Sequence, residues 1–313
     1  MCDRLAPHQL DYDWRFTEQT AAELARMVRG KRSLLLGCPT VAEALADNAS
    51  QAVLVDRQPA ATCRFTGRVI QADVRAGVDD LGHGAFDVIV LDSPWYPEDL
   101  LLWLDLALRL SKVGTTILFS LWPNRTRPSA AMETEAVFQR ILSRGRTERF
   151  KDALRYLTPG FEHYSMPGIG NEWRFGDLGS LSVEKPQPLG LPRPRMRAAW
   201  SRFAFDEFQV AVRVGASGGG ETKPTISRIY PSWHIPTVSR RQTNLHKIEI
   251  WSSDNEVGQL HGSKHFYNAL HALTLGRESS LSGFDREALT ILLDHGFVPA
   301  GRYSRRLEWT QFD

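Results

Sequence analysis

The chain has 313 residues with a formal net charge of +2, and its 42% hydrophobic and 24% charged content is ordinary for a soluble globular protein. That length suggests one large domain or two of ordinary size and can bury a full core without disulfide staples. The small net charge gives no indication of a nucleic-acid or membrane ligand, and no apolar run reaches the ~18 residues of a spanning helix. The first ten residues lack the apolar segment of a secretion signal, so we expect a cytoplasmic protein without membrane partners.

The cysteine and histidine pattern predicts no metal site. Cys2, Cys38 and Cys63 show no paired spacing, so neither a disulfide framework nor a zinc site is expected from them. His261 and His265 are four residues apart, as two ligands on one helix would be, but no third ligand lies near them.

The first part of the chain alternates short apolar runs with helical patterns. A helix is expected over 17–29, after an acidic and aromatic stretch at 11–16 that packs as a staple or covers a cofactor. Strands are expected at 33–37, 52–56, 69–73, 86–92 and 115–121, with helices at 40–47, 97–112 and 130–144. Because strands that alternate with helices build a parallel sheet covered on both faces, the sequence predicts an α/β fold.

The pattern loosens after residue 121. Segments 161–165 and 179–183 are expected to pair as an antiparallel hairpin at the edge of the sheet. The proline-rich segment 186–194 predicts a boundary between a domain of residues 1–188 and a C-terminal region of residues 189–313. That region is expected to be an α+β extension, with strands at 205–214, 247–251 and 297–309 and helices at 265–275 and 285–295.

Small and acidic residues stand where the first four strands end. Gly37, Asp56 and Asp73 end three of them, and Asp92-Ser93-Pro94-Trp95-Tyr96 follows the fourth, which stops near Asp92 because proline cannot continue a ladder. Open α/β sheets bind ligands at these carboxyl ends. An acid about 20 residues after the first strand's glycine is the usual position of a carboxylate that holds ribose hydroxyls.

In this order the strand ends resemble those of the Rossmann-type S-adenosylmethionine-dependent methyltransferases, over about residues 12–185. Asp92-Ser93-Pro94-Trp95 is similar to the Asp-Pro-Pro-aromatic motif of amino-group methyltransferases, which include adenine-N6 enzymes that act on DNA and RNA. The resemblance implies a Rossmann-like methyltransferase sheet with flanking helices and S-adenosylmethionine as cofactor. The residues that would hold the cofactor are Gly37, Cys38, Pro39, Asp56 and Asp73, the last at its adenine.

The resemblance also implies how an acceptor amine would be bound. The Asp92 carboxylate and a main-chain carbonyl near Ser93 or Pro94 would orient the two N–H groups and free the nitrogen lone pair. Trp95 or Tyr96 would stack on a base or another planar group. Positioning does most of the work in this chemistry, because the donor is already activated. Methylation of an amino nitrogen, with adenine N6 in nucleic acid as one substrate, is the leading function.

Two departures from the family pattern support alternatives. The first loop, 36–42, has a single glycine and a proline without a backbone N–H, and Ser93 replaces the first proline of the motif. Both favour an inactive methyltransferase-like subunit that binds nucleic acid or a protein partner. A further resemblance is to branched-chain polyamine synthases, which transfer an aminopropyl group from decarboxylated S-adenosylmethionine. It rests on the 11–16 stretch, the Gly-Lys-Arg at 30–32 and the Asp-x-Pro-aromatic order, but that family's acidic first loop is missing. Aminopropyl transfer therefore ranks below methyl transfer.

Aromatic and basic residues mix in the C-terminal region. The stretch 228–234 is followed by a pair of arginines, a composition that suits single-stranded nucleic acid or another anionic partner. The predicted contact residues are Tyr230, Trp233, Arg240 and Arg241. The alternative is a loop that packs its own aromatic rings. The expected partners are a nucleic-acid or small-amine substrate and a protein.

Overall fold

The computed structural model describes residues 5–58, 65–78, 81–166, 168–172, 174–195, 198–213, 215, 222–237, 239, 242–301, 303 and 306–312. Within these residues the chain forms two compact units. The first contains 14–158 and 170–195, and the second contains 5–13, 159–169 and the chain from 198 onward, so the second unit is discontinuous in sequence. A division into domains at residue 188 stays a prediction. In the part of the chain that is described, no helix has the length and apolar character needed to cross a bilayer.

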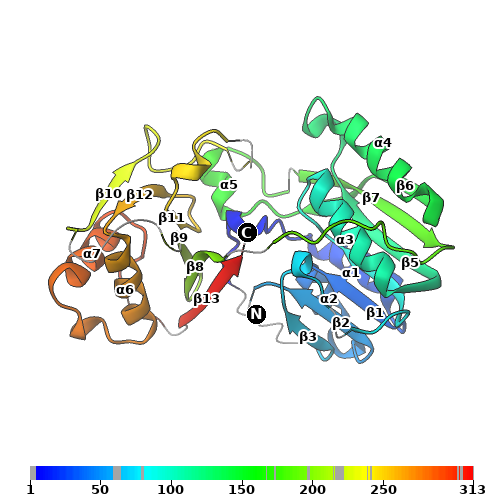
Figure 1. Cartoon of the computed structure of the whole chain (residues 1–313), viewed down its shortest axis with the longest axis horizontal. Coiled ribbons are helices and arrows are strands. Elements are labelled where there is room, and N and C mark those ends of the chain that lie inside the picture. Colours follow the sequence, from blue (N-terminus) through cyan, green and yellow to red (C-terminus); the bar gives the residue numbers. More distant parts are fainter. Residues whose placement is uncertain are drawn as a thin grey trace. The chain divides into compact units, whose positions relative to one another are not determined.

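The first unit is built on a seven-stranded sheet with the order β3-β2-β1-β4-β5-β7-β6 (Figure 1). Strands β1 to β5 pair in parallel, and β7 is antiparallel to both of its neighbours. The strands are β1 (Ser33–Leu36), β2 (Ala52–Asp56), β3 (Arg68–Gln71), β4 (Phe86–Leu91), β5 (Ser111–Leu121), β6 (Gly145–Tyr156) and β7 (Arg174–Val183). The predicted α/β sheet is confirmed.

Helices cover both faces of this sheet. They are α1 (Glu18–Val28), α2 (Pro39–Leu45), α3 (Pro97–Leu110) and α4 (Ala130–Ile141). Successive strand residues face opposite sides, so Leu34 and Leu36 lie in the core shared with α3 and α4, while Leu35 lies in the core shared with α1 and α2. Thr17 caps α1, because its side chain accepts the N–H of Thr20.

The expected hairpin between 161–165 and 179–183 is wrong in its first strand. Residues 161–165 form helix α5 (Gly160–Ser165) in the second unit, and the partner of β7 is β6. Strand β6 lies at the edge of the sheet, and exposed charged side chains such as Arg146, Glu148 and Lys151 interrupt the apolar alternation on which a strand prediction depends.

The proline-rich segment is held along the first unit. The Gly190 N–H donates to Asp105 Oδ1 on α3 at 2.9 Å, and the Arg144 guanidinium donates to the Pro188 carbonyl at 3.2 Å. Asp105 is buried and also receives the Arg109 guanidinium at 2.6 Å. Hydrogen bonds therefore hold the segment to the first unit at residues 188–190.

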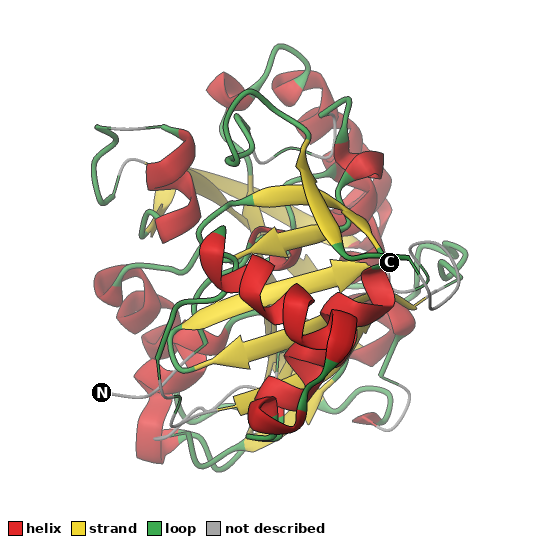
Figure 2. Cartoon of the chain, turned by 90° about the vertical axis from the view of Figure 1, so that its left-hand side faces the viewer, coloured by secondary structure: helices red, strands yellow, loops and turns green. Residues whose placement is uncertain are grey.

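The second unit contains a six-stranded antiparallel sheet with the order β10-β12-β11-β9-β8-β13. The strands are β8 (Ala198–Phe205), β9 (Phe208–Arg213), β10 (Thr225–Arg228), β11 (Ile250–Ser252), β12 (Val257–His261) and β13 (Arg306–Phe312). Helices α6 (Ser263–Thr274) and α7 (Gly283–Asp294) pack on one face through a core that includes Phe203, Leu270 and Leu292 (Figure 2). The predicted α+β character of this region is confirmed.

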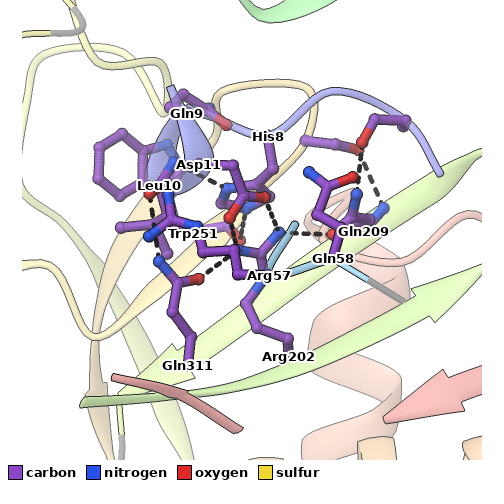
Figure 3. Close-up of polar contacts among 12 residues, drawn as sticks. His8, Gln9, Leu10, Asp11, Arg57, Gln58, Arg202, Gln209, Trp251 and Gln311 are labelled. Atoms are coloured by element: carbon purple, nitrogen blue, oxygen red, sulfur yellow. Dashed lines mark hydrogen bonds and ion pairs between the residues drawn. The ribbon is translucent and has the colours of Figure 1, made fainter. Parts of the chain in front are cut away.

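A buried arginine ties the N-terminal segment into the second unit (Figure 3). Arg202 on β8 is fully buried, and its guanidinium donates to both carboxylate oxygens of Asp11, at 2.9 and 3.3 Å. It also donates to the side-chain carbonyls of Gln209 and Gln311. The Gln311 amide in turn donates to the Leu10 carbonyl at 3.1 Å. A buried charge needs a partner, and segment 5–13 of the second unit supplies it through Asp11.

We expect Asp11→Ala to destabilise the second unit by about 3–5 kcal/mol, because it leaves the buried Arg202 charge without its carboxylate. Hydrogen exchange of β8 and β13 measures the loss as a lower opening free energy. The control is Glu287→Ala, which breaks an exposed ion pair with Lys223 and should cost less than about 1 kcal/mol. Equal protection in both variants would contradict this role of Asp11.

The turn between β11 and β12 carries a carboxyl group whose pKa is raised. Burial, followed by the negative charge of Asp254, raises the pKa of Glu256 from 4.5 to about 7. Its carboxylate lies against Gly296, where an added Cβ would be 3.3 Å from either oxygen. Between pH 4.5 and 7 the unfolded chain is ionised at this position while the folded chain keeps its proton, so stability falls as the pH rises through that window.

Glu256→Gln should therefore raise the melting temperature at pH 8 more than at pH 4.5, because the neutral amide removes the cost of ionising the buried acid. Thermal unfolding at both pH values measures the difference. The control is Glu287→Gln, which removes an exposed ion pair with Lys223 and should give no such gain in melting temperature at pH 8. A pH-independent effect of Glu256→Gln would contradict the raised pKa.

Candidate functional site

Strand register brings three of the predicted residues to one edge of the first unit's sheet. Leu36 on β1 is paired with Val55 on β2 and with Leu91 on β4, so the residues that follow these positions are neighbours. The Gly37 N–H donates to the Val55 carbonyl at 2.9 Å, and the Asp92 N–H donates to the Leu36 carbonyl at 3.1 Å. Gly37, Asp56 and Asp92 therefore lie side by side at the carboxyl ends of the parallel strands.

The loop after β1 is tight and apolar. Gly37 has a φ of +62°, and a Cβ at this position would lie 2.7 Å from Cη2 of Trp103 on α3, so both the backbone and the packing require glycine. The Cys38 side chain is fully buried, and its thiol lies 3.2 Å from the Leu36 carbonyl. Burial and the charges of Asp92 and Asp56 raise the pKa of this thiol well above its usual range. Pro39 begins α2.

The acids after β2 and β3 have different surroundings. Asp56 ends β2, and its Oδ1 accepts the N–H of Gln58 at 2.9 Å. Asp73 caps a short 3-10 helix and pairs with Arg75 at 2.8 Å and Arg57 at 3.8 Å. Burial alone would raise the pKa of Asp73, but the hydrogen bond from Arg75 and the two arginine charges lower it. Asp73, the acid predicted to contact adenine, is thus already paired with two guanidinium groups.

Asp92 has a partner from a distant part of the sequence. The Tyr156 hydroxyl, at the end of β6, donates to Asp92 Oδ1 at 3.0 Å. The Tyr156 ring packs against Phe16 with centroids 4.8 Å apart and edge-on against Trp95 at 5.6 Å. Sequence reasoning missed Tyr156, although the predicted aromatic stretch at 11–16 contains the Phe16 that packs on it.

Trp95 lies in an aromatic and cationic cluster. The Arg174 guanidinium on β7 lies 5.3 Å from the Trp95 ring centroid and 4.4 Å from that of Trp14. Tyr156 and Arg174 are directly paired residues of β6 and β7. We call Asp92, Trp95, Tyr156 and Arg174 the acceptor cluster. Its cation over Trp95 was not anticipated from the sequence.

The other residues of the predicted motif shape the turn into α3. Ser93 is buried, and its hydroxyl has no hydrogen-bond partner among the described residues. The Pro94 carbonyl accepts the N–H of Tyr96 at 2.7 Å. Tyr96 is the N-cap residue of α3, and Pro97 takes the first helical position. The motif is therefore a short turn that places Trp95 in contact with Tyr156 and Arg174.

The aromatic residues predicted to bind a partner from the C-terminal region contact their own unit. The Trp233 ring lies 5.1 Å from the Arg228 guanidinium and packs against His295 and Phe297. The Tyr230 hydroxyl accepts from the Gln242 amide at 3.3 Å. Arg240 and Arg241 lie outside the described residues.

The histidine pair is divided between two elements. His261 ends β12, whereas His265 on α6 places Nδ1 2.5 Å from Asp285 Oδ1. The described residues contain no group of three or more histidine, cysteine, aspartate or glutamate side chains arranged to hold a metal ion.

Gly37→Ala should destabilise the first unit more than Gly82→Ala does. Both glycines have positive φ, which costs an alanine about 1–2 kcal/mol, but only at Gly37 would the new Cβ also clash, with Trp103. At Gly82 nothing lies within 4 Å of that position. Denaturant unfolding of the two variants measures the difference, and equal losses would contradict the tight packing of this loop.

No protein-family model matches the chain, and no curated protein sequence is significantly similar to it. Among solved structures, a mutein of the branched-chain polyamine synthase from Thermus thermophilus, in complex with N4-aminopropylspermidine and 5'-methylthioadenosine, matches with a TM-score of 0.51 and 16% identity. The match covers 61% of this chain and 63% of that one, which is less than two thirds of its length.

Two further structures are similar at lower TM-scores. The unaltered Thermus thermophilus enzyme matches at 0.47 with 15% identity, over 61% of this chain and 63% of that one. The N-methyltransferase NodS from Bradyrhizobium japonicum WM9 matches at 0.37 with 15% identity, over 54% of this chain and 94% of that one. At such identity the likeness to the polyamine synthase concerns the fold alone. Together with the observed sheet, it supports the predicted α/β fold class, a mainly parallel sheet with flanking helices.

Proposed function

We propose that this protein transfers a methyl group from S-adenosylmethionine to an amino nitrogen. The observation that carries the proposal is the Asp92 carboxylate, held at the end of β4 by the Tyr156 hydroxyl and placed beside the strand ends that carry Gly37 and Asp56. An open parallel sheet binds its ligands at this edge. A methyl donor and an acceptor amine bound at this edge would lie next to each other, beside Asp92.

The residues at the ends of β1 and β2, where the donor would bind, fit an adenosyl ligand. The Gly37 turn lies beside the end of β2, where Asp56 supplies a carboxylate for ribose hydroxyls. Cys38 contributes through its main chain, because its side chain faces the core. Asp73 pairs with two arginines, so we assign it to shaping the end of β3. The sulfonium of the bound donor supplies an activated methyl group.

The acceptor half is suited to an amine. The Asp92 carboxylate can accept an N–H of the acceptor and so turn the nitrogen lone pair toward the donor. The Trp95 ring, already in contact with Arg174 and Tyr156, forms one wall. Because the partly buried Trp233 ring packs against His295 and Phe297, it offers less surface to a nucleic-acid base. We therefore place small amines ahead of adenine in nucleic acid as acceptors.

Aminopropyl transfer is the second candidate. The observation that favours it is the fold likeness to a polyamine synthase that was solved with an aminopropylated spermidine. The loop after β1 argues against it, because Gly37, Cys38, Pro39 and Thr40 offer no carboxylate to a cationic aminopropyl tail. An inactive subunit that binds nucleic acid or a protein partner is the remaining alternative, and it requires that no donor binds.

Calorimetry with the full chain tests the donor. We expect binding of S-adenosylmethionine and S-adenosylhomocysteine, and a loss of about tenfold or more in affinity in Asp56→Ala, since hydrogen bonds to a charged group contribute about 1.5–3 kcal/mol. The matched control is Asp87→Ala, near the opposite end of the parallel strands, where the carboxylate pairs with Lys112. It should leave the affinity unchanged.

The acceptor is tested by transfer of a radiolabelled methyl group to small amines, RNA, DNA and protein. Asp92→Asn should abolish transfer while it leaves donor affinity within about threefold, because the carboxylate acts on the acceptor. Preferential binding of decarboxylated S-adenosylmethionine would select aminopropyl transfer instead. If no adenosyl donor binds to folded protein, the enzyme proposal fails and the inactive subunit remains.

A further inference from the structure

Tyr156 reaches Asp92 across the sheet. In the strand order, β6 and β4 are separated by β7 and β5, yet the Tyr156 hydroxyl lies 3.0 Å from Asp92 Oδ1. The Tyr156 side chain is only 2% exposed. A long, rigid ring that crosses neighbouring strands to meet one carboxylate oxygen is well placed to fix the orientation of that carboxylate.

A glycine on the intervening strand makes this reach possible. Gly176 lies on β7, opposite Leu154 of β6, and two residues from the position paired with Tyr156. A Cβ on Gly176 would lie 3.0 Å from Cε2 of Tyr156 and 3.1 Å from Cζ2 of Trp95. Both distances are tighter than ordinary packing allows. The two aromatic rings therefore share the space that the missing side chain leaves.

The hydrogen bond has a fixed direction. Burial, the negative charge of Asp92 and the hydrogen bond itself raise the pKa of Tyr156 well above its usual value of 10. The phenol therefore keeps its proton throughout the physiological range, and its hydroxyl remains a donor to the Asp92 carboxylate. A donor that never ionises gives the carboxylate a permanent partner on Oδ1.

We propose that Tyr156 is a positioning residue, which holds the Asp92 carboxylate in the orientation needed to accept an N–H of the acceptor amine. The inference rests on the proposed function, because it assigns Asp92 to the acceptor. Loss of this hydrogen bond removes one of the contacts that orient the carboxylate, and a misplacement of about 1 Å in such a site costs up to about 100-fold in rate. Gly176 supports the same arrangement by leaving room for the ring.

The test compares Tyr156→Phe with the wild-type protein in the methyl-transfer assay. Removal of the hydroxyl alone keeps the ring and its packing, so we expect kcat to fall by about 10- to 100-fold while the affinity for S-adenosylmethionine stays within about twofold. The acid limb of the pH–rate profile should move to higher pH, because the carboxylate loses a donor that stabilises its charged form. Gly176→Ala should give the same pattern by displacing the ring.

Tyr267→Phe is the matched control. It removes an equivalent hydrogen bond, from the Tyr267 hydroxyl to Glu308 Oε1 at 2.9 Å, within the second unit. It should leave kcat and the pH–rate profile unchanged. A general loss of activity in both tyrosine variants would mean that Tyr156→Phe acts through stability, and it would overturn the positioning role.

A second readout needs no turnover. Carboxyl-labelled aspartate gives a ¹³C resonance for Asp92, identified by its absence in Asp92→Asn, and its titration midpoint should move to higher pH in Tyr156→Phe. If wild-type protein transfers no methyl group but the midpoint moves, the proposed function fails while the effect of Tyr156 on the carboxylate stands. If wild-type protein is active and neither kcat nor the midpoint changes in Tyr156→Phe, the positioning role is overturned.

Discussion

The hydrogen bond between Tyr156 and Asp92 ties the sheet topology to the candidate chemistry. It joins residues 64 positions apart, on strands that β5 and β7 separate. Because β7 is antiparallel to both β5 and β6, strand β6 runs in the same direction as β4, and Tyr156 at the end of β6 lies at the carboxyl end of β4. Phe16, Trp95 and Gly176 then pack around one ring. Without β6, the Asp92 carboxylate would lose its hydrogen bond from Tyr156.

The parallel part of the first unit could be predicted because its local patterns agree with its long-range pairing. The buried strands β1, β2 and β4 are short apolar runs, and each ends in a glycine or an acid where the ladder stops. That logic also gave the neighbouring positions of Gly37, Asp56 and Asp92. It failed at β6, because an edge strand with a charged outer surface lacks the apolar alternation that marks a strand. The missed strand carries Tyr156, so the acceptor cluster was incomplete.

The remaining differences come from contacts between distant segments. Arg202 looks like one more basic residue in a basic region, yet it is buried and its charge is matched by Asp11 near the start of the chain. Likewise, Trp233 suits a nucleic-acid surface by composition, but it packs against Phe297 and His295. Composition identifies the groups that are present, whereas only tertiary structure decides whether a partner in the same chain already satisfies them.

The central claim is that an adenosyl donor binds where β1, β2 and β4 end. Hydrogen exchange of the full chain, with and without saturating S-adenosylmethionine, tests it most directly because it locates binding along the sequence. A donor bound there should slow exchange at residues 37–42, 56–58 and 92–96, with little change in strands β8 to β13. Unchanged exchange in these three segments, or protection confined to the second unit, would contradict it.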